Sequence, residues 1–182
     1  MFSKEKLRKK YINIRKQKYF LTEDKLFRPL ISLIIKKKIS KISLYYPSNH
    51  EFSTIKLFQI LKKRRRVKTL LPIILKNNSM KFVYWKFCDP LLVNKFGFLE
   101  PPVNREKIIP DLILVPIVAF DKFNNRLGYG KGYYDRILRQ YILKNPNIIT
   151  IGLAFSFQKY KKIPISKFDV KLNYILTEKG FN

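Results

Sequence analysis

The order of apolar and polar positions along the chain predicts several short strands. Four continuous apolar runs are typical of strands that are buried on both faces of a parallel sheet. They cover residues 42–46, 112–116, 148–154 and 174–177. Two further apolar runs, 67–75 and 80–87, are separated by Asn77-Asn78-Ser79. A turn of this composition between two such runs favours a hairpin, and therefore a small antiparallel element.

Between these runs, apolar side chains recur at the spacing of an amphipathic helix. The predicted helices cover residues 3–18, 22–38, 54–61 and 132–143. Ser3 is expected to cap the first helix, and Ser53 or Thr54 the third. Strands that alternate with helices predict an α/β fold. We expect a single domain over residues 1–182, with three layers: a mostly parallel central sheet, helices on both faces, and the antiparallel element.

Length and composition agree with a globular protein of one domain. The chain has 182 residues, of which 46% are hydrophobic, so it can bury a sizeable core. No apolar run reaches the roughly 18–20 residues that a transmembrane helix needs. The basic N-terminal stretch lacks the apolar region of a signal peptide, which predicts a cytoplasmic protein. Cys88 is the only cysteine, so an intrachain disulfide and a thiol-based metal cluster are excluded.

The formal net charge of +27 allows two interpretations. Clustered Lys and Arg would form a surface for RNA or DNA. Alternatively, the charge follows from biased codon usage, because Lys, Ile, Asn, Phe and Tyr are abundant while Ala119 and Ala154 are the only alanines. The cations are spread over the whole chain, so we favour biased usage. Nucleic acid is therefore not expected to be the main partner, although non-specific adhesion to polyanions is.

The clearest candidate for chemistry is a loop with alternate glycines, Gly128, Gly130 and Gly132, between an apolar run and a predicted helix. Glycines allow a sharp turn and a close approach of the backbone to a ligand. Their N–H groups and the helix N-terminus would form an anion site, with Arg126 and Lys131 at its edge. The spacing matches neither the P-loop nor the dinucleotide motif. A merely tight turn remains the alternative.

Three other positions have both a functional and a structural interpretation. Lys4 and Arg8 lie four residues apart on one helix face, where they could hold a phosphate chain or simply be solvated. Glu51 lies between a strand end and a helix start, where α/β proteins bind ligands, but it could instead serve the helix dipole. Asp135 could coordinate Mg²⁺ beside a polyphosphate, or it could pair with Arg139 four residues later.

A family resemblance then emerges from the longest motif. The run VPIVAFDKFNNRLGYGKGYYDRIL resembles the signature of the 5-formyltetrahydrofolate cyclo-ligase family, also called methenyltetrahydrofolate synthetases. The segment KEKLR from Lys4 to Arg8 resembles the family's N-terminal ATP contact. Tyr46 and Glu51 stand at folate-contacting positions. Residues 96–101 resemble a Gly-Ile-x-Glu-Pro element, and Asp169 lies where the family has a second metal-contacting aspartate.

The resemblance implies an enzyme that converts 5-formyltetrahydrofolate and ATP into 5,10-methenyltetrahydrofolate, ADP and phosphate. It implies ATP contacts at Lys4, Arg8, Arg126, Leu127, Gly128, Tyr129, Gly130, Lys131, Gly132, Tyr133 and Tyr134. It implies folate contacts at Tyr46, Glu51, Tyr129, Gly130, Lys131, Gly132 and Tyr133. Arg126 and Lys131 would neutralise charge during catalysis, and Asp135 and Asp169 would hold Mg²⁺. A monomer that binds small molecules and no membrane is expected.

The chain departs from the family pattern at a few positions. Ile117 stands where glycine is usual, Phe168 where histidine often precedes the aspartate, and Asn173 where aspartate is usual. Tyr129 occupies a position that varies between Tyr and Arg. Asn173 raises the question of how the C-terminal loop is held. Two other functions stay open at this point: a folate-binding module that has lost turnover, and a basic RNA-binding protein.

Overall fold

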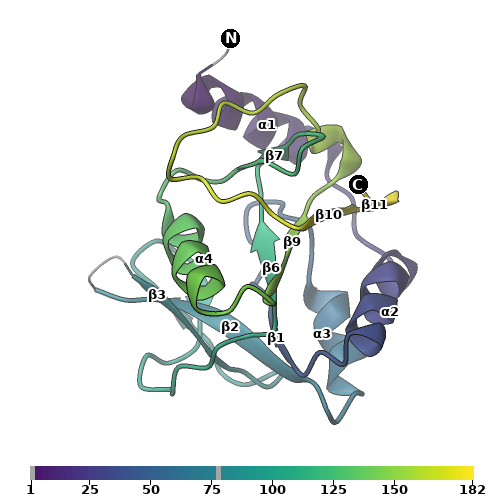
Figure 1. Cartoon of the computed structure of the whole chain (residues 1–182), viewed down its shortest axis with the longest axis vertical. Coiled ribbons are helices and arrows are strands. Elements are labelled where there is room, and N and C mark those ends of the chain that lie inside the picture. The colour runs from purple at the N-terminus through teal and green to yellow at the C-terminus, as the bar shows by residue number, and fades with distance from the viewer. Residues whose placement is uncertain (1–2, 77–78) are drawn as a thin grey trace.

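A seven-stranded sheet forms the centre of the protein (Figure 1). The computed structural model describes residues 3–76 and 79–182. Across the sheet, the strands follow one another as β11 (Gly180–Phe181), β10 (Tyr174–Thr177), β9 (Ile149–Leu153), β6 (Leu112–Pro116), β1 (Lys41–Ser43), β2 (Lys68–Ile74) and β3 (Met80–Tyr84).

The inner strands of this sheet are parallel, and its two edges are antiparallel. Parallel pairing joins β10, β9, β6, β1 and β2, whereas β3 pairs antiparallel with β2 and β11 with β10. The prediction of a central parallel strand at 112–116 is confirmed, because β6 lies between β9 and β1. The predicted hairpin is also confirmed in the pairing of β2 with β3. Its expected turn at Asn77-Asn78 lies outside the described residues.

Helices cover both faces of the sheet, as the three-layer prediction requires (Figure 1). The helices α2 (Arg28–Lys36) and α3 (Ile55–Lys62) pack on one face, with Leu30, Ile34 and Phe58 fully or almost fully buried. The helix α4 (Tyr133–Lys144) packs on the other face through Ile137, Leu138 and Tyr141. Burial of these apolar stripes on either side of the strands is the main source of stability.

The first helix, α1 (Lys4–Lys18), lies apart from the two covering layers. Its predicted cap is confirmed, since the Ser3 hydroxyl accepts a hydrogen bond from the Lys6 amide. The helix packs through Leu7 and Tyr11 onto a two-stranded hairpin, β7 (Ala119–Phe120) and β8 (Arg126–Leu127). This hairpin follows directly after β6. The helix α1 is therefore held beyond the carboxyl end of a central strand, where α/β proteins bind ligands.

The predicted second helix is divided into two parts. A 3₁₀ turn, η1 (Asp24–Phe27), precedes α2, and Pro29 lies in the first turn of α2. Proline has no N–H and clashes with the preceding turn, so it is accepted only at a helix start. The prediction of one helix over 22–38 was therefore wrong about its first residues.

A smaller difference concerns the cap of α3. Thr54 precedes α3, but its hydroxyl donates to the Tyr45 carbonyl at 2.6 Å and makes no capping bond. The stretch 96–101, which resembles the Gly-Ile-x-Glu-Pro element, contributes β5 (Leu99–Glu100), which pairs with β4 (Leu92–Val93). A second 3₁₀ turn, η2 (Ser156–Gln158), follows β9. Within the described residues, no helix is both long and apolar enough to span a bilayer.

Candidate active site

The glycine loop, residues 128–132, connects β8 to α4. At two of its positions the backbone has a conformation that glycine adopts more easily than other residues do. Gly130 has φ +96° and Gly132 has φ +69°, both in the left-handed region. A Cβ atom at Gly130 would lie 3.2 Å from the Cζ of Arg8, so a side chain there would press on that guanidinium. Gly132 immediately precedes the first turn of α4. The predicted tight turn is thus present, and it leads directly into a helix N-terminus.

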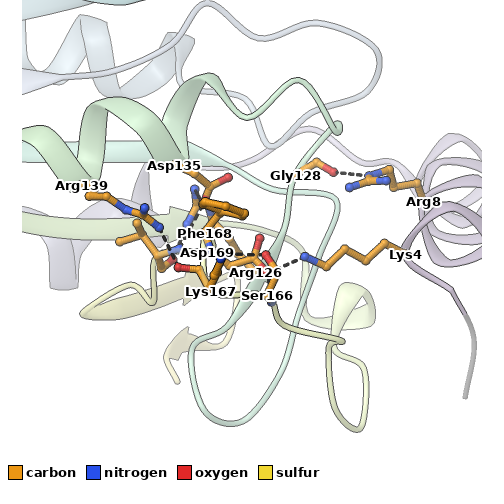
Figure 2. A network of polar contacts seen from close by, with 11 residues as sticks. Lys4, Arg8, Arg126, Gly128, Asp135, Arg139, Ser166, Lys167, Phe168 and Asp169 are labelled. Carbon is orange, nitrogen blue, oxygen red and sulfur yellow. Dashed lines mark hydrogen bonds and ion pairs between the residues drawn. The ribbon is translucent and has the colours of Figure 1, made fainter.

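The two cations predicted on α1 both turn toward this region (Figure 2). The Nε of Arg8 donates to the Gly128 carbonyl at 2.9 Å. The Lys4 ammonium forms an ion pair with Asp169, which is 165 positions away in the sequence. The face of α1 that carries Lys4 and Arg8 is therefore in contact with the glycine loop and the C-terminal loop. The alternative of a simply solvated basic face is wrong.

Asp135 pairs with Arg126 and not with Arg139. The Arg126 Nη2 lies 2.6 Å from the Asp135 Oδ1, and the Val170 amide donates to the same oxygen at 3.1 Å. Arg139 instead donates to the Lys167 carbonyl and lies over the Phe168 ring (Figure 2). The i,i+4 ion pair considered from sequence spacing is therefore absent, because a buried arginine from β8 competes for the carboxylate.

The two cations expected to act in catalysis lie in different environments. The Arg126 side chain is only 4% exposed, and burial lowers its pKa, an effect that the nearby Asp135 and Asp169 carboxylates partly offset. Its Nη1 also donates to the Val170 carbonyl. Lys131 is exposed, with its ammonium 5.8 Å from the centre of the Phe96 ring. Arg126 is thus a fixed charge, whereas Lys131 stands at the mouth of the cavity.

A cavity of about 380 Å³ opens beside the glycine loop, with mainly apolar walls. Segments 45–51, 94–100 and 126–134 contribute to its lining, together with side chains of β2 and β3. The predicted folate contacts all line it: Tyr46, Glu51, Tyr129, Gly130, Lys131, Gly132 and Tyr133. This volume is in the range of small-molecule sites.

The residues predicted to contact ATP are divided between the cavity and its surroundings. Arg126, Gly128 and Tyr134 line the cavity beside the other glycine-loop residues. Leu127 does not, because its side chain is 1% exposed and packs in the cluster beneath α1. The ATP contact expected at Leu127 stays a prediction. Lys4 approaches from α1, outside the cavity lining.

Glu51 is held inside the cavity by a strained turn. Asn49 and His50 both have positive φ angles, 48° and 61°, which non-glycine residues seldom adopt. The turn lets the Ser48 amide donate to Glu51 Oε2 at 2.9 Å, while the Tyr129 hydroxyl donates to Oε1 at 2.6 Å. These bonds tie the Glu51 carboxylate to the cavity wall. The alternative of a carboxylate that serves the α3 dipole is not supported.

Burial governs the protonation of this carboxylate. Desolvation raises the pKa of Glu51 above its ordinary value of 4.5, and the hydrogen bond from Tyr129 is the largest opposing effect. The same burial raises the pKa of the Tyr129 phenol well above its usual range. When Glu51 is ionised, Tyr129 therefore keeps its proton and donates it to the carboxylate in a hydrogen bond.

One functional candidate, Arg15, was missed from the sequence. Arg15 is 1% exposed and lies with its guanidinium over the Tyr129 ring, 5.5 Å from the ring centre. It follows Leu7 and Tyr11 at intervals of four residues, so an arginine in register with an apolar helix face was the available signal. Tyr134, by contrast, is one of the expected ATP contacts. Its hydroxyl is buried at the cavity, and within the described residues it has no hydrogen-bond partner.

The departures from the family pattern are accommodated by their neighbours. The Ile117 side chain lies against Gly152, where an added Cβ would be 3.1 Å from the Ile117 Cδ1. Asn173 accepts from both the amide and the hydroxyl of Thr150 at 2.8 Å, so a neutral amide oxygen holds the C-terminal loop to β9. Phe168 lies beneath the Arg139 guanidinium.

The two predicted metal carboxylates, Asp135 and Asp169, stay a prediction, and the chemistry of their oxygens is of the kind that Mg²⁺ prefers. In the part of the chain that the structure describes, no three His, Cys, Asp or Glu side chains form a metal-binding group. Asp135 accepts its hydrogen bonds through Oδ1 and Asp169 through Oδ2, so the second oxygen of each is the one that a metal would take. Mg²⁺ commonly uses one or two carboxylates together with phosphates and water.

Comparison with known proteins gives consistent results. A profile of the 5-formyltetrahydrofolate cyclo-ligase family matches residues 3–178. A 5-formyltetrahydrofolate cyclo-ligase of Haemophilus influenzae is 31% identical over 176 residues, covering 93% of this chain and 92% of the relative. One of Mycoplasma pneumoniae is 31% identical over 157 residues, covering 86% and 84%.

Solved structures agree in fold. The NMR structure of Aquifex aeolicus 5,10-methenyltetrahydrofolate synthetase superposes with a TM-score of 0.76 at 32% identity, covering 98% of this chain and 91% of that one. The structure of a 5,10-methenyltetrahydrofolate synthetase from Mycoplasma pneumoniae gives 0.71 at 28% identity, covering 97% and 99%. The profile match over nearly the whole length and the relatives above 30% identity lead to one conclusion: this chain belongs to the 5-formyltetrahydrofolate cyclo-ligase family, a family of ligases.

Proposed function

We propose that this chain catalyses the ATP-dependent cyclisation of 5-formyltetrahydrofolate to 5,10-methenyltetrahydrofolate, with release of ADP and phosphate. The observation that carries the proposal is the meeting of two unlike surfaces at the glycine loop. On one side lie the cations of α1, and on the other an apolar cavity with a single buried carboxylate, Glu51. A polyanion and a flat heterocycle could bind next to each other there.

The nucleotide half of the proposed site combines backbone and side-chain donors. The amides of the glycine loop and the N-terminus of α4 would accept the phosphates of ATP. Arg8 already lies over this loop, with its Nη1 3.5 Å from the Cβ position of Gly130. Lys4, now paired with Asp169, would exchange that carboxylate for a phosphate. Binding at this point would bring the γ-phosphoryl group toward the cavity.

The folate half would be organised by the Glu51–Tyr129 pair. A buried carboxylate is an acceptor for the N–H groups of a pterin ring, and aromatic walls favour a flat ligand. Tyr46, Tyr133 and the exposed Lys131 stand around the opening. Because the apolar walls exclude water, each polar contact inside the cavity is strengthened.

The formyl oxygen is a poor leaving group, and the proposed chemistry converts it into a phosphate ester, which leaves more easily. The formyl oxygen attacks the γ-phosphorus of ATP, ADP departs, and an N5 iminium phosphate forms. N10 then attacks the formyl carbon, the carbon–oxygen bond breaks, and phosphate leaves with the N10 proton. Such a transfer depends on positioning and on neutralising charge. Arg126 would supply a fixed positive charge, and Lys131 a mobile one. Bound Mg²⁺ on Asp135 and Asp169 would supply further neutralisation of the phosphates.

An assay separates the proposal from its alternatives. Purified protein incubated with 5-formyltetrahydrofolate and Mg·ATP should form methenyltetrahydrofolate, followed by its absorbance, with no product when ATP is omitted. Folate binding without product at any enzyme concentration would favour a binding module. Tight, salt-sensitive RNA binding without ATP binding would favour the RNA-binding alternative. We expect the purified protein to be a monomer, which sedimentation would check. We expect the protein to be cytoplasmic in the cell, which cell fractionation would check.

A further inference from the structure

The buried Arg15 joins three segments that are far apart in the sequence. Its Nη2 donates to the Asn49 carbonyl at 2.9 Å, and its Nη1 lies 3.5 Å from the Ile117 carbonyl. Its guanidinium also covers the Tyr129 ring. Arg15 thus connects α1 with the strained turn before Glu51, with the end of β6, and with the glycine loop.

An arginine at this buried position is expected to lower the stability of the fold. Its side chain is only 1% exposed, and within the described residues its Nε has no hydrogen-bond partner. A buried cation costs stability unless it is paired and fully hydrogen-bonded. The carbonyls of Asn49 and Ile117 and the face of the Tyr129 ring leave the Arg15 guanidinium only partly hydrogen-bonded. An apolar side chain would suit the face formed by Leu7 and Tyr11 better, so packing alone does not account for Arg15.

The positive charge of Arg15 acts on the negatively charged carboxylate of Glu51. Arg15 lowers the pKa of Glu51, against the larger effect of burial, which raises it. The titratable or charged groups that face Glu51 are Arg15 from α1, Tyr45 after β1, Tyr129 from the glycine loop and Tyr134 from α4. Among these, Arg15 is the cation. It is not part of the cavity lining, whereas two other cations, Arg126 and Lys131, line the cavity together with Glu51.

We propose that Arg15 is a positioning residue for the Glu51–Tyr129 pair, which it holds in the geometry that receives the folate ring. The hydrogen bond from Arg15 to the Asn49 carbonyl fixes the strained turn. The guanidinium of Arg15 fixes the plane of the Tyr129 ring. Arg15 would therefore act on folate through two other side chains, without contact of its own. This inference rests on the proposed function, since it assumes that Glu51 and Tyr129 bind folate.

The test measures binding of each substrate separately. Calorimetry with 5-formyltetrahydrofolate alone should show about a tenfold weaker affinity for Arg15→Met, because the turn at Asn49 and the Tyr129 ring lose the group that holds them. Affinity for ATP alone should change less than about twofold, since the phosphate groups are met by other residues. Arg15→Lys should recover part of the folate affinity. Lys16→Met, an exposed cation on the same helix, is the matched control and should bind both ligands like the wild type.

Two further readouts distinguish positioning from a role in folding alone. When the pH is lowered, Arg15→Met should lose folate binding at a higher pH than the wild type does. Without the cation, Glu51 takes up a proton more readily. Arg15→Met and Glu51→Gln should also be non-additive in folate affinity, as expected for residues that act as one unit. A purely structural residue would lower the melting temperature without moving this pH profile.

The possible failures have different meanings. Absence of folate binding by the wild type would overturn both the proposed function and the role of Arg15. If the wild type binds and Glu51→Gln weakens binding, but Arg15→Met does not, only the positioning role is wrong. Equal losses of folate and ATP affinity in Arg15→Met would also overturn it. Should Arg15→Met fail to fold, the comparison of Arg15→Lys with Lys16→Met decides. A folate affinity in Arg15→Lys equal to that of Lys16→Met would contradict the proposal, because lysine cannot reproduce the contacts of the guanidinium.

Discussion

The Tyr129 hydroxyl donates a hydrogen bond of 2.6 Å to the Glu51 carboxylate, although the two residues are 78 positions apart in the sequence. This bond connects the glycine loop, where phosphates are proposed to bind, with the turn that follows β1. A change on either side of the site can therefore affect the other. The bond also explains how a carboxylate can stay in a largely apolar cavity, because each oxygen has a donor.

Removing that hydroxyl should weaken folate binding more than it weakens the fold. Tyr129→Phe keeps the ring under Arg15 but leaves Glu51 Oε1 without its donor, a loss of about 1–2 kcal/mol. We expect a roughly tenfold lower folate affinity in calorimetry, by the same free energy. Tyr174→Phe, on the exposed face of β10, serves as the control. Unchanged affinity in Tyr129→Phe would show that the bond does not organise the folate site.

Ionisation of Glu51 should cost stability near neutral pH. Its folded pKa is raised above 4.5, so the folded state holds its proton more tightly than the unfolded state does. Stability then falls as pH rises from about 4.5 through the folded pKa, and this penalty is fully present above it. Glu51→Gln should melt at a higher temperature than the wild type at pH 7. The difference should shrink toward pH 4.5, while Glu23→Gln, an exposed position, should show no such trend.

A side chain at Gly130 should disturb the nucleotide site. The residue has φ +96°, and a Cβ there would press on the Arg8 guanidinium. Gly130→Val should lower stability by about 1–3 kcal/mol through backbone strain and abolish ATP binding in calorimetry. Gly180→Val is the matched control, because Gly180 has a φ of +102° but a Cβ there would meet open space. Normal ATP affinity in Gly130→Val would leave the loop as a tight turn only.

Two substitutions at Asp135 should separate its structural and catalytic contributions. Asp135→Ala leaves the buried Arg126 without its ion pair and should cost about 1–3 kcal/mol, given that the carboxylate is partly exposed. Asp135→Asn keeps an oxygen for Arg126 but loses the negative charge. Both should reduce turnover at saturating folate far more than folate affinity. If Asp135→Asn turned over like the wild type across a magnesium titration, the metal role would be wrong.

The C-terminal loop should tolerate the aspartate that related proteins usually have at position 173. Asn173 acts as an acceptor for the amide and hydroxyl of Thr150. Asn173→Asp retains an acceptor and should change stability by less than about 0.5 kcal/mol. Asn173→Ala loses both bonds and should cost about 1 kcal/mol in chemical denaturation. A large loss in Asn173→Asp would mean that the amide nitrogen has a role of its own.

Local patterns were sufficient for much of the fold. Continuous apolar runs located β6 and β9, and helical spacing located α1 and α4, because these features depend on which face of an element is buried. The division of the second helix at Pro29 was less accessible. A proline near a helix start is compatible with either a continuous helix or a preceding 3₁₀ turn, and tertiary packing decides.

The sequence indicated which residues gather around the cavity, but not how they pair with one another. The glycine spacing and the family motif pointed to the loop, to Glu51 and to Asp135. They could not show that Asp135 meets Arg126, since that contact competes with an equally well-spaced Arg139. Nor could they show that Arg15 is buried, because an arginine on a basic helix is usually solvated. Such contacts are set by elements distant in sequence.

The position of α1 has a consequence for how the protein folds. The helix docks through contacts of very long sequence separation: 165 positions for Lys4 with Asp169, and 148 for Tyr11 with the Lys159 carbonyl. Contacts of this kind form late, since a long loop must close before they give any stabilisation. During synthesis, α1 cannot complete these contacts until residues 159–170 have been made. The capacity to bind ATP would then appear in one of the last steps of folding, well after the sheet.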